Sequence, residues 1–332
     1  MHIKSVDQLL MLVVLALYSL PGYGQAEAVS FTRAGYTIEV SIGGKSFTSY
    51  HFEPDTSKAY LQPLRSAHGL VVTRGFPVGE AVPVEHEHDR GFEPHQRPMY
   101  FGHGDTGGYD FWTEEIFAKY YGSDFKGRWG RMVLRKIEKM RNGSNSGTIR
   151  ATFDLLGSDH KSFAEESQEY TFSGDKDSRV IDCQYVIRAN HRPVKMGDTK
   201  EGTFAIRVAP ELTAPMGRMV NSEGAEGEPE IWGKRANWVD YDGVIDGQTV
   251  GIAIFDSPKS FRHPTYWHAR GYGLFAANPF GIKQFRHDPM QDGGYTIPAG
   301  KSIRFRYRVL IHDGNYKDAR VAEKYRQYAA HQ

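Results

Sequence analysis

The chain has 332 residues, with 41 Lys and Arg against 40 Asp and Glu, so its formal charge is only +1. This balance gives no electrostatic reason to expect nucleic acid or an acidic membrane surface as a partner. Cys183 is the only cysteine, which excludes an internal disulfide. About 300 mature residues can bury enough apolar surface to fold without one.

The N-terminal segment has the layout of a secretory signal peptide. A short basic start leads into an apolar run, Leu9 to Leu20 (LLMLVVLALYSL), and then into small residues, Pro21 to Ala28. The apolar run is shorter than the roughly 20 residues that span a bilayer. We predict a signal peptide over residues 1–26, a single mature domain over residues 27–332 with no membrane span, and a bacterial protein that is periplasmic or secreted. An uncleaved anchor is the alternative.

The stretch from Glu93 to Trp112 (EPHQRPMYFGHGDTGGYDFW) combines histidines, arginine, aspartates and aromatic residues with several glycines and prolines. The glycines and prolines argue against a helix, and the polar residues do not alternate as in a half-buried strand. We predict a short strand near Met99 to Gly102 that opens into a structured loop. Loops on a rigid scaffold often carry binding and catalytic groups. The alternative is a surface loop with ordinary solvated histidines.

Most of the remaining chain has a period of two. Apolar and polar residues alternate in three long segments: Gly147 to Leu156, Arg179 to Asn190, and Ser302 to Ile311. Strands with one apolar and one polar face indicate antiparallel sheet. Helical spacing is clearest near the C-terminus, from about Tyr316 to Ala330. The pattern predicts an all-β fold, a large antiparallel β-sandwich with a short C-terminal helix.

Three further clusters combine aromatic and polar residues. Lys200 and Glu201 precede an alternating strand; the other two clusters contribute Trp232 and Trp238, and then His268, Arg270 and Asn278. Aromatic faces beside fixed donors and acceptors suit a sugar, whose C–H faces stack while its hydroxyls form hydrogen bonds. For each tryptophan, packing in the core is the alternative.

Two other motifs carry less weight. The segment Gly102 to Gly107 (GHGDTG) matches G-x-G-x-x-G, but no βαβ pattern surrounds it, so dinucleotide binding is not expected. His86 and His88 could form a metal-binding pair, because alternate residues of a strand point the same way.

Five blocks of sequence resemble the DUF6807 family, which is often labelled "methane oxygenase PmoA". These blocks are Ala59 to Pro77, Pro94 to Trp112, Asp198 to Val208, Ile231 to Asp256, and Arg262 to Gly281. The resemblance implies an exported bacterial protein from a carbohydrate-degradation setting, with a fold similar to the galactose-mutarotase supersandwich. The methane oxygenase label does not suit this chain, because membrane methane monooxygenase subunits need several transmembrane helices.

The histidine motif of that family commonly runs H-P-H-H-R-G before F-x-H-G. The matching residues here are Glu93-Pro-His-Gln-Arg-Pro98, so His95 and Arg97 remain, followed by His103. Two histidines of the motif are replaced, which weakens any metal-binding role carried over from it. We therefore expect no cofactor. A divalent metal at His95, His103 and His268 is the alternative.

These observations favour a carbohydrate-active protein with a concave sugar pocket. Histidine donates or accepts protons near neutral pH, so the candidate acid and base groups are His95, His103, Glu201 and His268. The candidate substrate-binding residues are Arg97, Asp105, Trp112, Lys200, Trp232, Trp238, Arg270 and Asn278. Epimerisation, elimination or glycosidic cleavage would need an acid and a base on opposite sides of the ring. A carbohydrate-binding protein without turnover, or a structural partner in a surface complex, are the alternatives.

Overall fold

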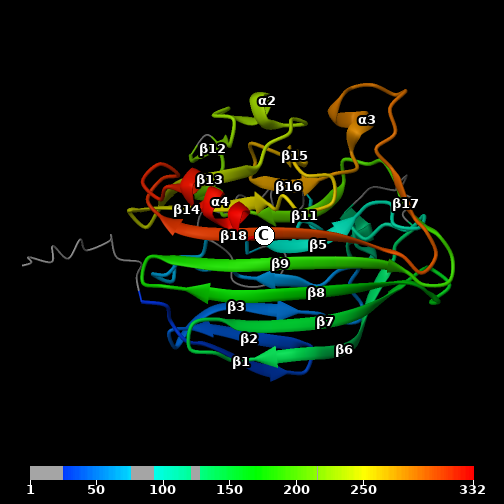
Figure 1. Ribbon diagram of the computed structural model, residues 1–332, viewed down its shortest axis with the longest axis horizontal. Helices are drawn as coiled ribbons and strands as arrows, with labels where there is room; N and C mark the ends of the chain where they lie inside the picture. The colour runs from blue at the N-terminus through cyan, green and yellow to red at the C-terminus, as the bar shows by residue number, and fades with distance from the viewer. Residues whose placement is uncertain (1–24, 76–92, 121–127, 215) are drawn as a thin grey trace, which may run out of the picture.

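The computed structural model describes residues 25–75, 93–120, 128–214 and 216–332. Within these residues, two eight-stranded antiparallel sheets pack face to face (Figure 1). The predicted fold class, a large antiparallel β-sandwich, is confirmed. The predicted signal peptide lies almost wholly outside the described residues, as do His86 and His88.

The first sheet has the strand order β1-β2-β3-β4-β5-β11-β16-β15. Its first five strands follow one another along the chain, and the other three come from the C-terminal half. The strands are β1 (Val29–Ala34), β2 (Thr37–Ile42), β3 (Lys45–His51), β4 (Tyr60–Gln62), β5 (Met99–His103), β11 (Gly202–Arg207), β16 (Leu274–Asn278) and β15 (Tyr266–Ala269).

The second sheet has the strand order β12-β13-β14-β18-β9-β8-β7-β6. Its strands are β12 (Arg218–Asn221), β13 (Trp238–Ile245), β14 (Gln248–Asp256), β18 (Ser302–Asp313), β9 (Ser178–Ala189), β8 (Ser162–Gly174), β7 (Gly147–Leu156) and β6 (Arg131–Arg141). A separate pair of short strands joins β10 (Val194–Met196) to β17 (Tyr295–Ile297).

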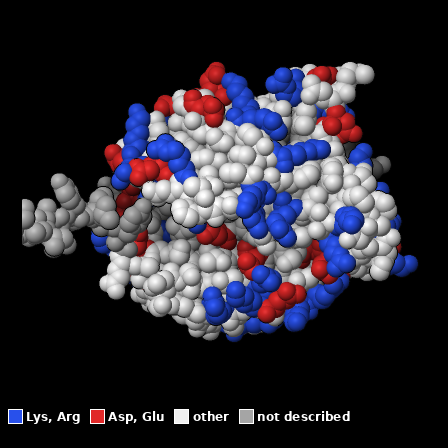
Figure 2. All heavy atoms as spheres, in the orientation of Figure 1, with Lys and Arg blue, Asp and Glu red and all other residues white. Residues whose placement is uncertain are grey.

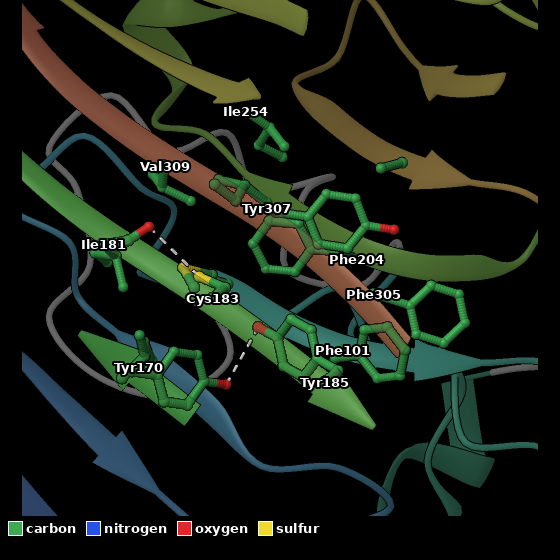
Figure 3. Close-up of a cluster of buried hydrophobic side chains, with 14 of the residues drawn as sticks. Phe101, Tyr170, Ile181, Cys183, Tyr185, Phe204, Ile254, Phe305, Tyr307 and Val309 are labelled. Atoms are coloured by element: carbon green, nitrogen blue, oxygen red, sulfur yellow. Dashed lines mark hydrogen bonds between the residues drawn. The ribbon is translucent and has the colours of Figure 1, made fainter. Parts of the chain in front are cut away.

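The core lies between the two sheets and is rich in aromatic rings. Phe101 of β5 stacks on Tyr185 of β9 with 4.3 Å between ring centroids, and Phe204 of β11 stacks on Tyr307 of β18 at 4.7 Å (Figure 3). Cys183 is buried in the same cluster and is not in a disulfide. These contacts join strands that are far apart in sequence, so they fix the packing of one sheet on the other.

The alternating segments form the strands that the sequence predicts. Strand β7 has the predicted bounds, and β9 and β18 differ from theirs by one or two residues at an end. Their polar residues point away from the core, so Lys and Arg lie intermixed with Asp and Glu on the outward face of the second sheet (Figure 2). By contrast, every residue of β5 and β11 is buried, which shows that the outward face of the first sheet is covered there.

Helix α4 (Val321–Ala330) covers part of the outward face of the second sheet. Val321, Tyr325 and Tyr328 pack against a cluster that includes Trp238 and Phe255. The predicted start at Tyr316 is five residues too early, because Arg320 adopts a left-handed conformation with φ of 55° and the preceding residues form turns.

The other helices are single turns: η1 (Glu115–Tyr120), η2 (Pro210–Leu212), α2 (Glu228–Ile231) and α3 (Ile282–Phe285). Figure 1 shows α2 and α3 beyond the edge formed by β15 and β16. In the part of the chain that the structure describes, no helix has the length and apolar character needed to cross a bilayer.

Candidate functional site

The outward face of the first sheet carries most of the predicted site residues. Alternate residues of β5, β11 and β16 point away from the core, and they form a second buried cluster on this face. The cluster consists of Tyr60, Tyr100, Trp112, Ala205, Leu274 and Ala276, with Tyr272 packed against it. Aromatic rings and small side chains therefore form the floor of the candidate site.

One wall of the site is the segment that precedes β5. His95 Nε2 lies 3.0 Å from Glu93 Oε2, and the His95 ring packs near Trp112. Arg74 donates to the Glu93 carbonyl, which fixes this residue in a left-handed conformation with φ of 51°. Burial opposes ionisation of Glu93, but its hydrogen bond and attraction to His95 lower the pKa overall. Glu93 is therefore a carboxylate beside the imidazole of His95.

Gln96 ties this wall to β11 and to the loop before β16. Its Oε1 accepts from Arg207 Nη1 at 3.0 Å, and its Nε2 donates to the Tyr272 hydroxyl at 3.3 Å. The Arg207 guanidinium also lies over the Tyr272 ring, 4.3 Å from its centroid. Gln96 replaces a histidine of the family motif, and here it has a structural role.

The opposite wall is the segment from Thr199 to Glu201. Asn278 Nδ2 donates to the Thr199 and Lys200 carbonyls at 3.0 Å each, and Lys200 pairs with Glu201. His268 Nδ1 lies 2.9 Å from the Lys200 carbonyl. Because a carbonyl only accepts, Nδ1 must carry the proton of this hydrogen bond.

The environment of His268 keeps it neutral. Burial lowers the pKa of His268 to about 3, and the positive charges of Lys200 and Arg270 lower it as well. A neutral imidazole protonated on Nδ1 leaves Nε2 as a proton acceptor. Among the described residues, no hydrogen bond involves this Nε2. His268 thus presents an acceptor nitrogen in surroundings that disfavour a positive charge on the ring.

Beneath Trp112 lies a buried ion-pair network. Arg97 donates to both oxygens of Glu114 at 2.8 and 3.1 Å, and Lys58 Nζ lies 3.2 Å from Glu114 Oε1. Burial opposes ionisation of Glu114, yet Arg97 and Lys58 lower its pKa to about 2. Lys58 also donates to the Trp112 carbonyl. The network supports the floor and is covered by it, so Arg97 cannot reach a ligand directly.

Two polar atoms in the floor are buried without a hydrogen-bond partner among the described residues: the Tyr100 hydroxyl and Trp112 Nε1. Burial raises the pKa of Tyr100 well above its usual value, and the charges of Glu201 and Glu93 raise it further. Tyr100 therefore stays protonated between the two walls. Buried unpartnered donors are uncommon and costly, so they are often functional.

Three predicted residues lie elsewhere. His103 shares a strand face with Phe101, so its side chain points inward. Its Nε2 donates to the Gly197 carbonyl at 2.9 Å, and its ring contacts Phe280. Burial lowers the pKa of His103 to about 4. Asp105 accepts from the backbone of Gly108 in the loop after β5. Trp238 lies in the second sheet beneath α4.

The alternative metal site is not assembled. His103 points to the inward side of the first sheet, whereas His95 and His268 lie on its outward side. Within the described ranges, no group of three His, Cys, Asp or Glu side chains is arranged to hold a metal ion. Metal independence remains a prediction.

A hollow of about 500 Å³ adjoins the Lys200 wall. It is lined by Lys200, Trp232, Arg270, Lys283, Gln284, His287 and Pro289. Trp232, Arg270 and Lys200 are predicted site residues, and this hollow brings the three side chains together. A second hollow of about 380 Å³ lies beside α4, on the outward face of the second sheet, and contains none of the predicted residues.

Several residues of the site were missed or given another role. Glu93, Tyr100, Arg207 and Tyr272 are not among the site residues that the sequence predicts. The alternation of side chains between the two faces of a strand could have identified Tyr100 and Arg207. In the predicted strand near Met99, Tyr100 lies opposite the apolar Met99 and Phe101, and Arg207 alternates with Phe204 and Ile206.

The fold and this site define a β-sandwich protein with a polar, aromatic-floored site on the outward face of one sheet. The chain belongs to DUF6807, a family of unknown function, whose model matches residues 37–326. No curated protein matches the sequence significantly.

Similar solved structures extend this likeness at the level of the fold alone. A galactose mutarotase-like protein from Clostridium acetobutylicum has 12% identity and a TM-score of 0.40, covering 86% of this chain and 98% of that one. Another, from Lactobacillus casei, has 9% identity and a TM-score of 0.38, covering 86% and 100%. A GH36 α-galactosidase from Geobacillus stearothermophilus, solved with raffinose, has 13% identity and a TM-score of 0.41. That match covers 88% of this chain but only 41% of the enzyme.

Proposed function

We propose that the outward face of the first sheet binds a carbohydrate and that the protein is an enzyme acting on the sugar ring. Supporting this are an aromatic floor, two polar walls and titratable groups on both walls. A sugar presents C–H faces that pack on aromatic rings and hydroxyls that need donors and acceptors. The face offers both kinds of contact within one small area.

In this proposal His268 is the base. Its Nε2 is unprotonated at neutral pH, because Nδ1 is held by the Lys200 carbonyl and the pKa is far below 7. His95, on the other wall, is the acid, since the Glu93 carboxylate orients its imidazole and would stabilise a positive charge on it. Glu201 and Lys200 would bind hydroxyls or share the proton transfer. Epimerisation, elimination and glycosidic cleavage all need such a pair.

The observation that carries the proposal is the state of His268: a neutral imidazole with a defined tautomer and an unused acceptor, close enough to Glu93 for that charge to affect the ring. Buried histidines that serve only packing usually have both nitrogens satisfied or surrounded by apolar groups. Here Lys200, Arg270 and Glu93 all contribute to the electrostatics of the ring.

The test is turnover by His268→Ala on a panel of glycans and keto-sugars. A positioned base contributes roughly 10²–10⁴-fold, so turnover should fall by about that factor while circular dichroism and sugar binding are unchanged. The exposed His191→Ala is the matched control and should behave as wild type. Full activity of His268→Ala would disprove the assigned role.

A carbohydrate-binding protein without turnover is the second candidate. It is favoured by the low exposure of the two histidines, 5% for His95 and 2% for His268, because a group that transfers a proton must come within hydrogen-bond reach of its substrate. If the wild-type protein binds sugars from the panel but converts none, and both histidine mutants bind normally, the protein is a carbohydrate-binding protein and the enzyme hypothesis is rejected.

We also propose that the protein acts outside the cytoplasm, on the basis of the N-terminal sequence. A mature form beginning near Gln25 or Glu27 should be found in the periplasm or the medium. Mass spectrometry of native protein that finds Met1 retained in a membrane fraction would contradict export.

A further inference from the structure

The hollow beside Lys200 is distinguished by its charge. Three basic side chains line it, Lys200, Arg270 and Lys283, and the described residues of its lining include no Asp or Glu. Two of its lining residues belong to elements that Figure 1 shows on the same side of the molecule: Trp232 follows α2, and Lys283 is part of α3. A neutral sugar would not need this concentration of positive charge.

Two of the cations have carboxylate partners just outside the hollow, but these partners compensate them only in part. Lys200 pairs with Glu201, and Arg270 Nε lies 3.2 Å from Glu228 Oε1. The Arg270 contact lacks the alignment of a hydrogen bond, and the other Glu228 oxygen accepts from the backbone of Gly271. About a third of each side chain of the Arg270–Glu228 pair is exposed, so this pairing is weak and exchangeable.

Lys283 has no carboxylate partner among the described residues. The nearest acidic residue along this wall is Asp198, and its Oδ2 accepts from the backbone N–H groups of Lys283 and Gly293. Asp198 therefore anchors α3 through the main chain and leaves the Lys283 ammonium exposed at the hollow. This cation is available to a ligand.

Trp232 supplies a donor with no acceptor. Its Nε1 is buried without a hydrogen-bond partner in the described part of the chain, and its ring packs against Phe285 and His287. A buried indole N–H normally finds an acceptor, because leaving it unpaired is costly. The missing acceptor would be supplied by a ligand oxygen beside the three cations.

We infer that this hollow binds the anionic group, carboxylate or sulfate, of an acidic sugar unit adjacent to the unit at His268. The inference rests on the proposed function and narrows its substrate to an acidic glycan. Lys283 and Arg270 neutralise the charge, and Trp232 donates to one oxygen and offers its ring to the sugar. The hollow and the site are adjacent, since Lys200 lines the hollow and its carbonyl accepts a hydrogen bond from His268 in the site.

The test compares oligosaccharides that differ only in charge. Oligogalacturonides and alginate oligomers are each paired with their carboxyl-reduced neutral forms, and κ-carrageenan oligomers with their desulfated forms. Binding is measured by calorimetry at low salt. A charged member should bind about tenfold or more tightly than its neutral partner, since one charge-assisted contact supports that ratio, and salt should reduce the preference.

Two variants locate the preference. Lys283→Gln removes the unpaired charge, so it should lower the charged-to-neutral ratio several-fold and leave neutral binding unchanged. Trp232→Phe removes the donor while keeping a ring, so it should weaken binding of the charged members more than binding of the neutral ones and thereby lower the ratio as well. Lys45→Gln, at an exposed position of β3, is the control and should keep the ratio.

The outcomes separate this inference from the proposed function. Equal or tighter binding of the neutral members, or a ratio unaffected by both variants, would refute the acidic subsite while leaving a sugar site in place. Failure of every oligosaccharide to bind would remove the sugar site itself. A preference in the sulfated pair alone would support the subsite and identify sulfate as its ligand.

Discussion

The outward faces of the two sheets hold ion pairs in very different surroundings. On the second sheet, cross-strand pairs such as Arg150–Glu169 and Arg135–Asp154 lie in water, with about 45% of each arginine side chain exposed. On the first sheet, Lys58, Arg97 and Glu114 form a network in which no side chain is more than 1% exposed.

This difference indicates where charged residues can be replaced without loss of stability. An exposed ion pair is screened by solvent and stabilises by 0 to about 1 kcal/mol. A buried pair contributes uncertain net stability when complete, but removing one partner leaves a desolvated charge and costs about 3–5 kcal/mol. The second sheet therefore tolerates changes of charge, whereas the first sheet combines its candidate site with a network that cannot lose a member.

The largest expected effect is that of Glu114→Ala. Because Arg97 and Lys58 would both be left buried without their common partner, the free energy of unfolding should fall by about 3–5 kcal/mol. Chemical denaturation measured at pH 7 gives this value directly. Glu114 is ionised there, since its pKa is about 2, and Lys58 is mostly protonated, since burial lowers its pKa only to about 8.

A triple variant checks the physical reason. Lys58→Met, Arg97→Met and Glu114→Leu together remove every charge, so they should destabilise less than Glu114→Ala alone. If the single and triple variants lose the same stability, packing volume rather than stranded charge explains the loss.

The strands could be predicted from sequence where one face of the strand is exposed to solvent. In β7, β9 and β18, polar residues alternate with apolar ones, so sequence alone gives the strands and their inward faces. In β5 and β11 both faces are buried, and the alternation disappears. The strands that form the candidate site are therefore the hardest to recognise by periodicity.

The candidate site could be predicted in part for a related reason. Six predicted residues come together because each lies in a strand of the first sheet or in a segment that adjoins its outward face. They are His95, Lys200, Glu201, His268, Arg270 and Trp232. Residue type alone could not separate His95 from His103, since that depends on which side of β5 each side chain leaves. Nor could it show that Trp112 lies in the floor as a fully buried ring.

A second prediction concerns Glu166, a carboxyl group that is buried between the two sheets. Glu166 accepts from Gln168 at 2.7 Å, while Gln168 Oε1 accepts from the hydroxyls of Tyr50 and Tyr170. Burial raises the pKa of Glu166 from 4.5 to about 8, although the Gln168 hydrogen bond opposes this. The folded protein thus holds a proton that the unfolded chain has released between these pH values.

Stability should therefore fall as pH rises through this window, because the folded state binds more protons than the unfolded state. Glu166→Gln keeps the shape and the acceptor but cannot ionise. It should match wild type near pH 4 and exceed it by on the order of 2–4 kcal/mol above pH 8. Parallel curves of unfolding free energy against pH for the two proteins would contradict a protonated Glu166.

The smallest expected effect is on the outward face of the second sheet. Arg150 and Glu169 are opposite one another on β7 and β8, with Arg150 Nε 2.6 Å from Glu169 Oε2. Because the guanidinium is 43% exposed, the coupling energy from a double-mutant cycle of Arg150→Ala and Glu169→Ala should be about 0.2–1 kcal/mol. It should shrink further in 1 M salt, where charges are screened within a few ångströms. Coupling above about 2 kcal/mol that survives high salt would mean that this face is not solvated as its exposure indicates, and the contrast between the two sheets would be lost.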